Sequence, residues 1–380
     1  RGGGGRCLRG ALYEQGGDEG GGEKERSHSI ILAPVLQPPP SKPGSSQPNK
    51  LSAIGYRPSA SSCLFSRLLA SLPVACRLSP AVQGILPTLR QGQPEPRDMS
   101  ATDLQGRTFL VTGANSGIGR ALVEALAARG GGVVLAARSE ERTRPVIDVI
   151  RRRYPAADAR FLEIDVSDLT SVRRAAGKFL AGGAGPLDVL VNNAGVAGTN
   201  ALSPDGFDLT YATNHIGPFL LTNLLLPLVS DSPQGRIVNV SSVGHLRAKQ
   251  IDWSVLERRA TPKRSGFADY AVTKLMNVLH AKELARRLTG TRVTTYSLHP
   301  GAVASNIWRA LPGSLQWFLK LFMLTNEEGA RTPLYCATAP ELATVTGSYY
   351  DKCREVPPNP LANDPALAQE LWARTEAAVA

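Results

Sequence analysis

The chain has 380 residues, of which 42% are hydrophobic and 20% charged, so it is long enough for one large domain or two and apolar enough to bury a sizeable core. Its five cysteines are too few for a disulfide scaffold and lack the spacing of zinc ligands, and we expect no bound metal. No run approaches the roughly 18 uncharged apolar residues of a membrane-spanning helix, which argues against an integral membrane protein.

The net charge of +11 is spread along the chain. Residues 1–98 hold 12 basic and 7 acidic side chains, and the remainder holds 31 and 25, so neither part carries a concentrated excess. Dispersed charge of this kind is typical of a solvated surface, whereas nucleic-acid binding calls for a basic patch. We therefore expect no nucleic acid among the partners.

Residues 1–98 differ in composition from the rest of the chain. They are rich in Gly, Pro and Ser, include Pro38–Pro40, and sustain no period of 3.6 or 2, which predicts a disordered extension. The first methionine is Met99, so one interpretation is an upstream extension without function. The other is a targeting segment, because residues 27–94 lack Asp and Glu and Ser62–Leu69 is apolar with Ser and Arg. We expect a cytoplasmic protein, or one peripheral to an intracellular membrane, rather than a mitochondrial one.

Residues 99–380 are predicted to form one domain in which short apolar, β-branched runs alternate with helical patterns. Such runs indicate parallel strands covered on both faces. The fold class is therefore α/β, a single doubly wound parallel sheet of the Rossmann type with helices on both faces. The expected strands lie at 108–112, 133–137, 160–164, 189–191, 236–240 and 293–297, and the first helices at 119–129 and up to Arg153.

A glycine-rich turn follows the first expected strand and opens the first helix. Three glycines there allow a tight turn and a close approach of the backbone to a pyrophosphate at the helix N-terminus, where free N–H groups attract anions. Position and context both favour dinucleotide binding over an ordinary turn. The candidate residues are Gly113, Asn115, Ser116, Gly117, Ile118 and Gly119.

The end of the second strand indicates which dinucleotide is bound. An acidic residue there would bind the ribose hydroxyls of NAD, whereas Arg138 offers a bidentate fork to the 2′-phosphate of NADP, and Ser139 adds a hydroxyl. The alternative is that Arg138 is an ordinary surface arginine. We predict NADP as the cofactor, in preference to NAD.

Tyr270 and Lys274 lie one helical turn apart on one face of an expected helix. A free tyrosine, with a pKa of about 10, is a poor acid near neutrality, and a neighbouring ammonium is expected to lower that pKa. Ser242 at the end of a strand and Asn214 upstream complete the candidate catalytic set, with Ser241 as the alternative to Ser242.

Together these motifs resemble the short-chain dehydrogenase/reductase family. Within the family, the segment 214–219 and the 28-residue spacing from Ser242 to Tyr270 are most similar to the retinol dehydrogenase branch. The resemblance covers about residues 104–350 and rests on 112–119, 192–195, Asn214, Ser242, Tyr270, Lys274 and 299–301.

The resemblance implies a role for each matching position. Tyr270 would exchange a proton with the substrate oxygen, Ser242 would polarise that oxygen, Lys274 would bind the nicotinamide ribose, and Asn214 would hold a water that relays protons. The remaining cofactor contacts would be Asp165 and Val166 at adenine, Asn192, Ala194 and Gly195 on the adenosine side, and Pro300, Gly301, Val303 and Ser305 over the nicotinamide.

The segment 303–325 is apolar and aromatic, and the resemblance implies a substrate lid. Two alternatives stay open, a subunit contact in a homodimer and a helix resting on a membrane surface. The sequence as a whole predicts an NADP-dependent enzyme that interconverts a carbonyl and an alcohol on a small apolar substrate such as a retinoid, steroid or lipid aldehyde. The alternative functions are a catalytically quiet cofactor-binding scaffold and a membrane-surface adaptor.

Overall fold

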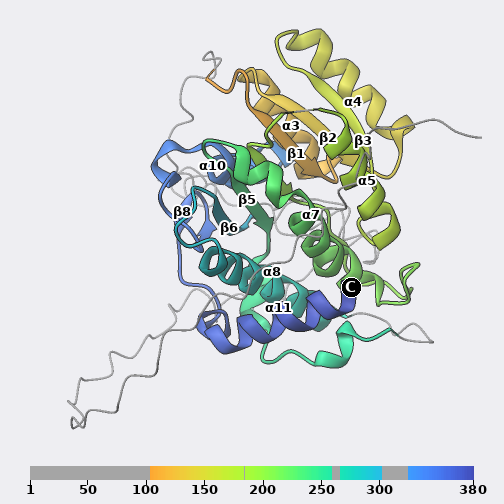
Figure 1. Ribbon diagram of the computed structural model, residues 1–380, viewed down its shortest axis with the longest axis vertical. Coiled ribbons are helices and arrows are strands. Elements are labelled where there is room, and N and C mark those ends of the chain that lie inside the picture. Colours follow the sequence, from red (N-terminus) through yellow and green to blue (C-terminus); the bar gives the residue numbers. More distant parts are fainter. Residues whose placement is uncertain (1–102, 184, 259–265, 302–323) are drawn as a thin grey trace, which may run out of the picture. The chain divides into compact units, whose positions relative to one another are not determined.

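A computed structural model describes residues 103–183, 185–258, 266–301 and 324–380 (Figure 1). The expected extension 1–98 and nearly all of the expected lid lie outside these ranges, as do Val303 and Ser305. Among the described helices, none has the length and hydropathy that crossing a bilayer requires.

The described part of the chain forms an eight-stranded sheet in the order β3-β2-β1-β4-β5-β6-β7-β8. Strands β1 to β7 pair in parallel, and β8 pairs antiparallel with β7, so the predicted parallel sheet is confirmed with one antiparallel edge strand added. The strands are β1 (Thr108–Thr112), β2 (Gly132–Ala137), β3 (Ala159–Glu163), β4 (Val189–Asn192), β5 (Arg236–Val240), β6 (Thr294–His299), β7 (Tyr349–Asp351) and β8 (Arg354–Glu355).

Helices cover both faces of the sheet, as predicted (Figure 1). Alternate residues of β1 point to opposite faces: Phe109 and Val111 pack under α3 and α4, and Leu110 packs on the side of α5, α7 and α8. The helices are α3 (Gly117–Ala128), α4 (Glu140–Arg153), α5 (Leu169–Ala181), α6 (Leu209–Tyr211), α7 (Gly217–Asp231), α8 (Phe267–Arg287), α10 (Asn326–Thr338) and α11 (Pro365–Val379).

The strand order reverses between β1 and β4, because the chain runs from β1 outward to β3 and then crosses back to β4. In open parallel sheets, ligands bind at the carboxyl ends of the strands beside this reversal. The candidate residues within the described ranges end a strand, follow one, or lie on α3, on α8 or in the helical turn Ala212–Ile216, so the topology brings distant parts of the sequence together here.

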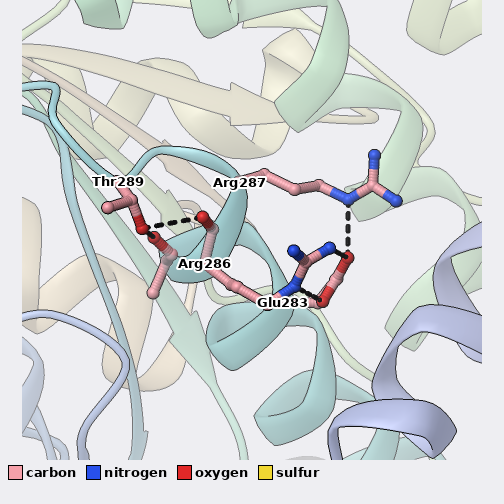
Figure 2. Close-up of polar contacts among 5 residues, drawn as sticks. Glu283, Arg286, Arg287 and Thr289 are labelled. Atoms are coloured by element: carbon pink, nitrogen blue, oxygen red, sulfur yellow. Dashed lines mark hydrogen bonds and ion pairs between the residues drawn. The ribbon is translucent and has the colours of Figure 1, made fainter. Parts of the chain in front are cut away.

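The C-terminal helix α11 packs on α8, and an ionic cluster lies at the end of α8 (Figure 2). The Glu283 side chain is only 1% exposed and receives hydrogen bonds at 2.7–2.8 Å from both Arg286 and Arg287. The Arg287 guanidinium also lies 4.2 Å from the ring centroid of Trp372 on α11. Burial opposes ionisation of Glu283, but the hydrogen bonds from the two arginines prevail and lower its pKa.

Candidate active site

The glycine-rich turn between β1 and α3 has the shape that a close backbone approach requires. Gly113 and Gly117 have φ values of +69° and +58°, in the left-handed region that favours glycine. A Cβ placed on Gly119 would lie 2.5 Å from the carbonyl oxygen of Gly113, so only glycine fits there. Ser116 begins α3 without capping it through a side-chain hydrogen bond. The turn therefore fits a pyrophosphate held on backbone N–H groups.

The turn is fastened to the loop that follows β4 by residues outside the predicted set. The Thr112 hydroxyl accepts hydrogen bonds from the backbone N–H groups of Asn193 and Ala194, each at 3.0 Å. The Asn193 side chain donates to the carbonyl oxygen of Thr112 at 2.8 Å. Both residues lie within the motifs at 112–119 and 192–195, but the motifs alone do not show that their side chains join the two loops.

Asn192 differs from the expectation that its side chain lines the adenosine side. It is 5% exposed, and its Nδ2 donates to Thr222 at 3.0 Å and to Asn239 at 2.9 Å, inside the sheet and against α7. Its side chain thus positions β4, while Ala194 lies against the cradle, 3.1 Å from where a Cβ of Gly113 would stand. The side chain of the last residue of a strand can point to either face of the sheet, and the spacing of the motifs does not predict which face it takes.

At the adenosine end, Arg138 and Asp165 leave the ends of adjacent strands β2 and β3. The Arg138 side chain is 72% exposed, and its Nη1 lies 3.8 Å from Asp165 Oδ2, while Asp165 Oδ1 accepts from Ser167. Ser139 caps α4 by accepting from the N–H of Arg142 at 3.3 Å, which leaves its own proton to donate. Val166 follows Asp165 and is buried. An exposed guanidinium at this place is free to turn toward a bound phosphate.

The predicted reacting residues meet at the ends of β5 and α8. Tyr270 is 7% exposed, and a hydrogen bond joins its phenol to Ser242. The Lys274 Nζ lies 5.5 Å from the centroid of the Tyr270 ring and donates to the carbonyl oxygen of Val240 at 2.9 Å. Ser241 points away and donates to the carbonyl oxygen of Lys274 at 2.7 Å, so Ser242 is the serine beside the tyrosine.

The expected lowering of the Tyr270 pKa does not appear in the structure. Burial raises this pKa above its ordinary value of 10.0, and the Ser242 hydrogen bond offsets the rise only in part. Burial also lowers the pKa of Lys274 from 10.5 to about 8. The attraction between ammonium and phenolate predicted from the sequence does not offset the loss of water around the phenol, which is the largest cause of the shift.

Asn214 lies in a π-helical turn, Ala212–Ile216, that leads into α7. Its side chain makes three hydrogen bonds: Oδ1 accepts from the N–H of Val196 at 2.8 Å, and Nδ2 donates to the Val196 carbonyl at 2.9 Å and to Thr273 at 3.0 Å. This clasp holds the loop after β4 against α8. A Cβ on Gly195 would lie 3.4 Å from Lys274 Nζ and 3.3 Å from Asn214 Oδ1, so the loop passes close to the lysine.

Pro300 and Gly301 follow β6 at the same edge, and Gly301 has a φ of +94°. Within the described ranges, no group of three or more His, Cys, Asp or Glu side chains gathers as metal ligands. The arrangement is thus a glycine-rich turn, an exposed guanidinium after β2, and a buried tyrosine and lysine beside the partly exposed Ser242. These residues fit a dinucleotide whose reactive end lies beside Tyr270.

Comparisons with known proteins agree with this reading of the geometry. Residues 107–255 match the family model of the short chain dehydrogenases. Human dehydrogenase/reductase SDR family member 13 is 41% identical over 71% of this chain and 72% of its own length, and human retinol dehydrogenase 12 is 39% identical over 71% and 85%. A crystal structure of an uncharacterised Mycobacterium paratuberculosis protein superimposes with a TM-score of 0.59 at 31% identity, covering 73% of this chain and 97% of that one.

Proposed function

Because this chain belongs to the short-chain dehydrogenase/reductase family, in its retinol dehydrogenase branch, and is an oxidoreductase that binds a nicotinamide cofactor, we propose that it reduces a carbonyl on a small apolar substrate with NADPH. The observation that carries the proposal is the meeting of Tyr270, Ser242 and Lys274 beside the glycine cradle.

Ser242 and Tyr270 have separate roles in the proposed reduction. The cofactor supplies the hydride that reaches the carbonyl carbon. Ser242 donates a hydrogen bond to the carbonyl oxygen and so stabilises the negative charge that develops there. Tyr270 gives its phenolic proton to the same oxygen, which completes the alcohol, and regains a proton from solvent.

The protonation state of Tyr270 at neutral pH suits the role of a proton donor. A phenol whose pKa lies above 10 is protonated at pH 7, and a proton donor must be protonated before the reaction begins. In the oxidation direction the phenolate would be needed first, and burial opposes it. Lys274 donates a hydrogen bond to Val240, and Asn214 is hydrogen-bonded to Val196 and Thr273. These two side chains thus fix the segments around the phenol through those bonds.

Preference for NADPH rests on Arg138. Its exposed guanidinium follows β2 where a 2′-phosphate would sit, and no acidic residue precedes Glu140 in that turn. Arg138→Ala should weaken NADPH binding about tenfold or more, the loss of one charged hydrogen-bonding fork, and leave NADH binding unchanged. Arg144→Ala is the matched control, since Arg144 is similarly exposed and also faces a carboxylate, that of Glu140, but lies within α4 and not at the end of β2. Equal effects on NADPH and NADH would refute the assignment.

The catalytic proposal is tested with a panel of retinal, a steroid ketone and a long alkanal, following consumption of NADPH. Tyr270→Phe should abolish turnover and keep NADPH affinity within about threefold, because only the hydroxyl is removed. Tyr349→Phe is the matched control, another buried tyrosine that lies near Tyr270. Turnover that survives in the Tyr270 variant would refute the role of the phenol, and a wild-type protein that binds NADPH without turnover would favour the scaffold.

A further inference from the structure

Ser242 lies two residues beyond the end of β5, so the sheet does not fix its backbone. A 3-10 turn, Val243–Arg247, begins directly after it and includes His245, which is completely buried. The carbonyl oxygen of Ser242 lies 2.7 Å from Nδ1 of His245 and also accepts the backbone N–H of His245 at 3.0 Å. The imidazole thus touches the main chain of the residue that polarises the substrate oxygen.

The other ring nitrogen of His245 faces a distant part of the chain. Its Nε2 lies 3.0 Å from the backbone N of Asn359, 114 residues further on. A carbonyl oxygen can only accept and a backbone N–H can only donate, so the ring must carry its proton on Nδ1 and be neutral. Burial lowers the pKa of His245, which agrees with a neutral ring.

Asn359 holds the whole turn, not only the imidazole. Its Nδ2 donates to the carbonyl oxygens of His245 at 2.9 Å and Ala248 at 2.8 Å, and its Oδ1 accepts the N–H of Leu361 at 2.9 Å. The residue is 4% exposed and stands between two prolines, which restrict its backbone. The ring of Tyr349 packs against the His245 ring, with 4.6 Å between the ring centroids.

We propose that His245 is a positioning residue that fixes the backbone of Ser242 through its Nδ1–H, and that Asn359 holds His245 in the orientation this requires. The proposal rests on the proposed function for the role of Ser242. A hydrogen-bond donor to a developing oxyanion must be held within a few tenths of an ångström, and such precision comes from the residues behind it. The Ser242 hydroxyl itself accepts the N–H of Gly244 at 3.1 Å, so the same turn sets its rotamer.

Two substitutions separate the two contacts of the ring. In His245→Asn the side-chain amide nitrogen takes the place of Nδ1 and keeps a donor to the Ser242 carbonyl, but the contact with Asn359 is lost. In His245→Gln the amide oxygen takes the place of Nε2 and keeps an acceptor for the Asn359 N–H, but the donor to Ser242 is lost. We expect kcat to fall at least about tenfold in the Gln variant and to stay within about threefold in the Asn variant, with KM for NADPH unchanged in both.

Amide hydrogen exchange at Gly244 gives a readout that needs no turnover. The Gly244 N–H donates to the Ser242 hydroxyl, so its exchange should be faster in the Gln variant than in the Asn variant. His280→Gln is the control, since His280 is equally buried but packs against Phe219 and Trp372; it should lower stability and leave kcat and Gly244 exchange unchanged.

The ranking of the two variants decides the proposal. Equal losses in kcat and equal exchange at Gly244 would mean that His245 only fills space, and a lower kcat in the Asn variant would reverse the proposed order. If the wild-type enzyme turns over no member of the panel, that result counts against the proposed function alone, and the exchange of Gly244 still confirms or refutes the positioning.

Discussion

Lys274 is a buried cation whose removal should stabilise the protein while destroying its activity. The side chain is 3% exposed, and burial lowers its pKa from 10.5 to about 8. At pH 7 the lysine is protonated in both the folded and the unfolded protein, but the folded protein binds the proton more weakly, and the fall in pKa corresponds to about 3 kcal/mol of lost stability. Lys274→Met removes this cost, keeps the volume, and leaves the Val240 carbonyl with a hydrogen bond from Asn277 at 3.3 Å.

The substitution should raise the free energy of unfolding of the cofactor-free protein by about 2 kcal/mol at pH 7, once about 1 kcal/mol for the lost hydrogen bond is deducted. The gain should depend on pH. Between pH 8 and 10.5 the unfolded chain binds the lysine proton and the folded protein does not, so the stability of the wild type rises with pH. By pH 9.5 about 2 kcal/mol is regained, and the two proteins should then be equally stable.

Urea unfolding of the two cofactor-free proteins at pH 7 and pH 9.5 measures the difference directly. Lys178→Met on α5 is the control, because this lysine is exposed in the last turn of its helix and its replacement should change the stability little. A Lys274 variant that is less stable than the wild type at pH 7, or whose advantage is the same at both pH values, would refute the reasoning.

Two further substitutions test the cradle and the ionic cluster. Gly119→Ala should destabilise the protein by about 1–3 kcal/mol and weaken NADPH binding at least about tenfold, because its Cβ would stand 2.5 Å from the Gly113 carbonyl oxygen. The control is Gly177→Ala, at an exposed helical position with nothing within 4 Å, which should be neutral or stabilising. Thermal unfolding with and without NADPH compares the two variants. Glu283→Gln should lower the free energy of unfolding by about 1–2 kcal/mol near neutral pH, less than the loss of a fully buried ion pair, because the two arginines are partly exposed. This difference should shrink in acid, because the wild-type carboxylate, whose pKa is lowered, becomes protonated there. Glu370→Gln, in an exposed pair, should change the urea midpoint little, and equal effects of the two glutamine variants would contradict the argument.

The strands of the sheet could be predicted because each is a continuous apolar run, and all six expected strands are present within two residues of their expected bounds. The hairpin of β7 and β8 could not, since its strands have three and two residues and its turn has positive φ at Lys352 and Cys353. Neither residue is typical of such a turn, where Asn and Gly prevail. The hydrophobic pattern of strands this short is not sufficient to predict a hairpin.

That the candidate catalytic residues lie together could also be predicted, but their electrostatics could not. Spacing places Tyr270 and Lys274 on one helical face, and the structure brings both to Ser242. The sign of the Tyr270 pKa shift depends on how much water each group loses, which is a property of everything packed around it. A sequence motif predicts which side chains lie together, but it does not predict how much water the surrounding protein removes from them.

Residues that no motif marks hold the segments around the candidate catalytic side chains. Ser242 is held through the turn that Asn359 fastens, the Val240 carbonyl is shared by Lys274 and Asn277, and the loop beside the lysine is clasped through Thr273. Such residues act through buried hydrogen bonds whose loss leaves a partner unsatisfied, at a cost of about 1–3 kcal/mol. The geometry of this site therefore depends on long-range packing as well as on the motif residues. Substitutions at Asn359 and Thr273 should lower the stability of the protein more than substitutions at exposed residues of the glycine-rich turn, such as Ser116.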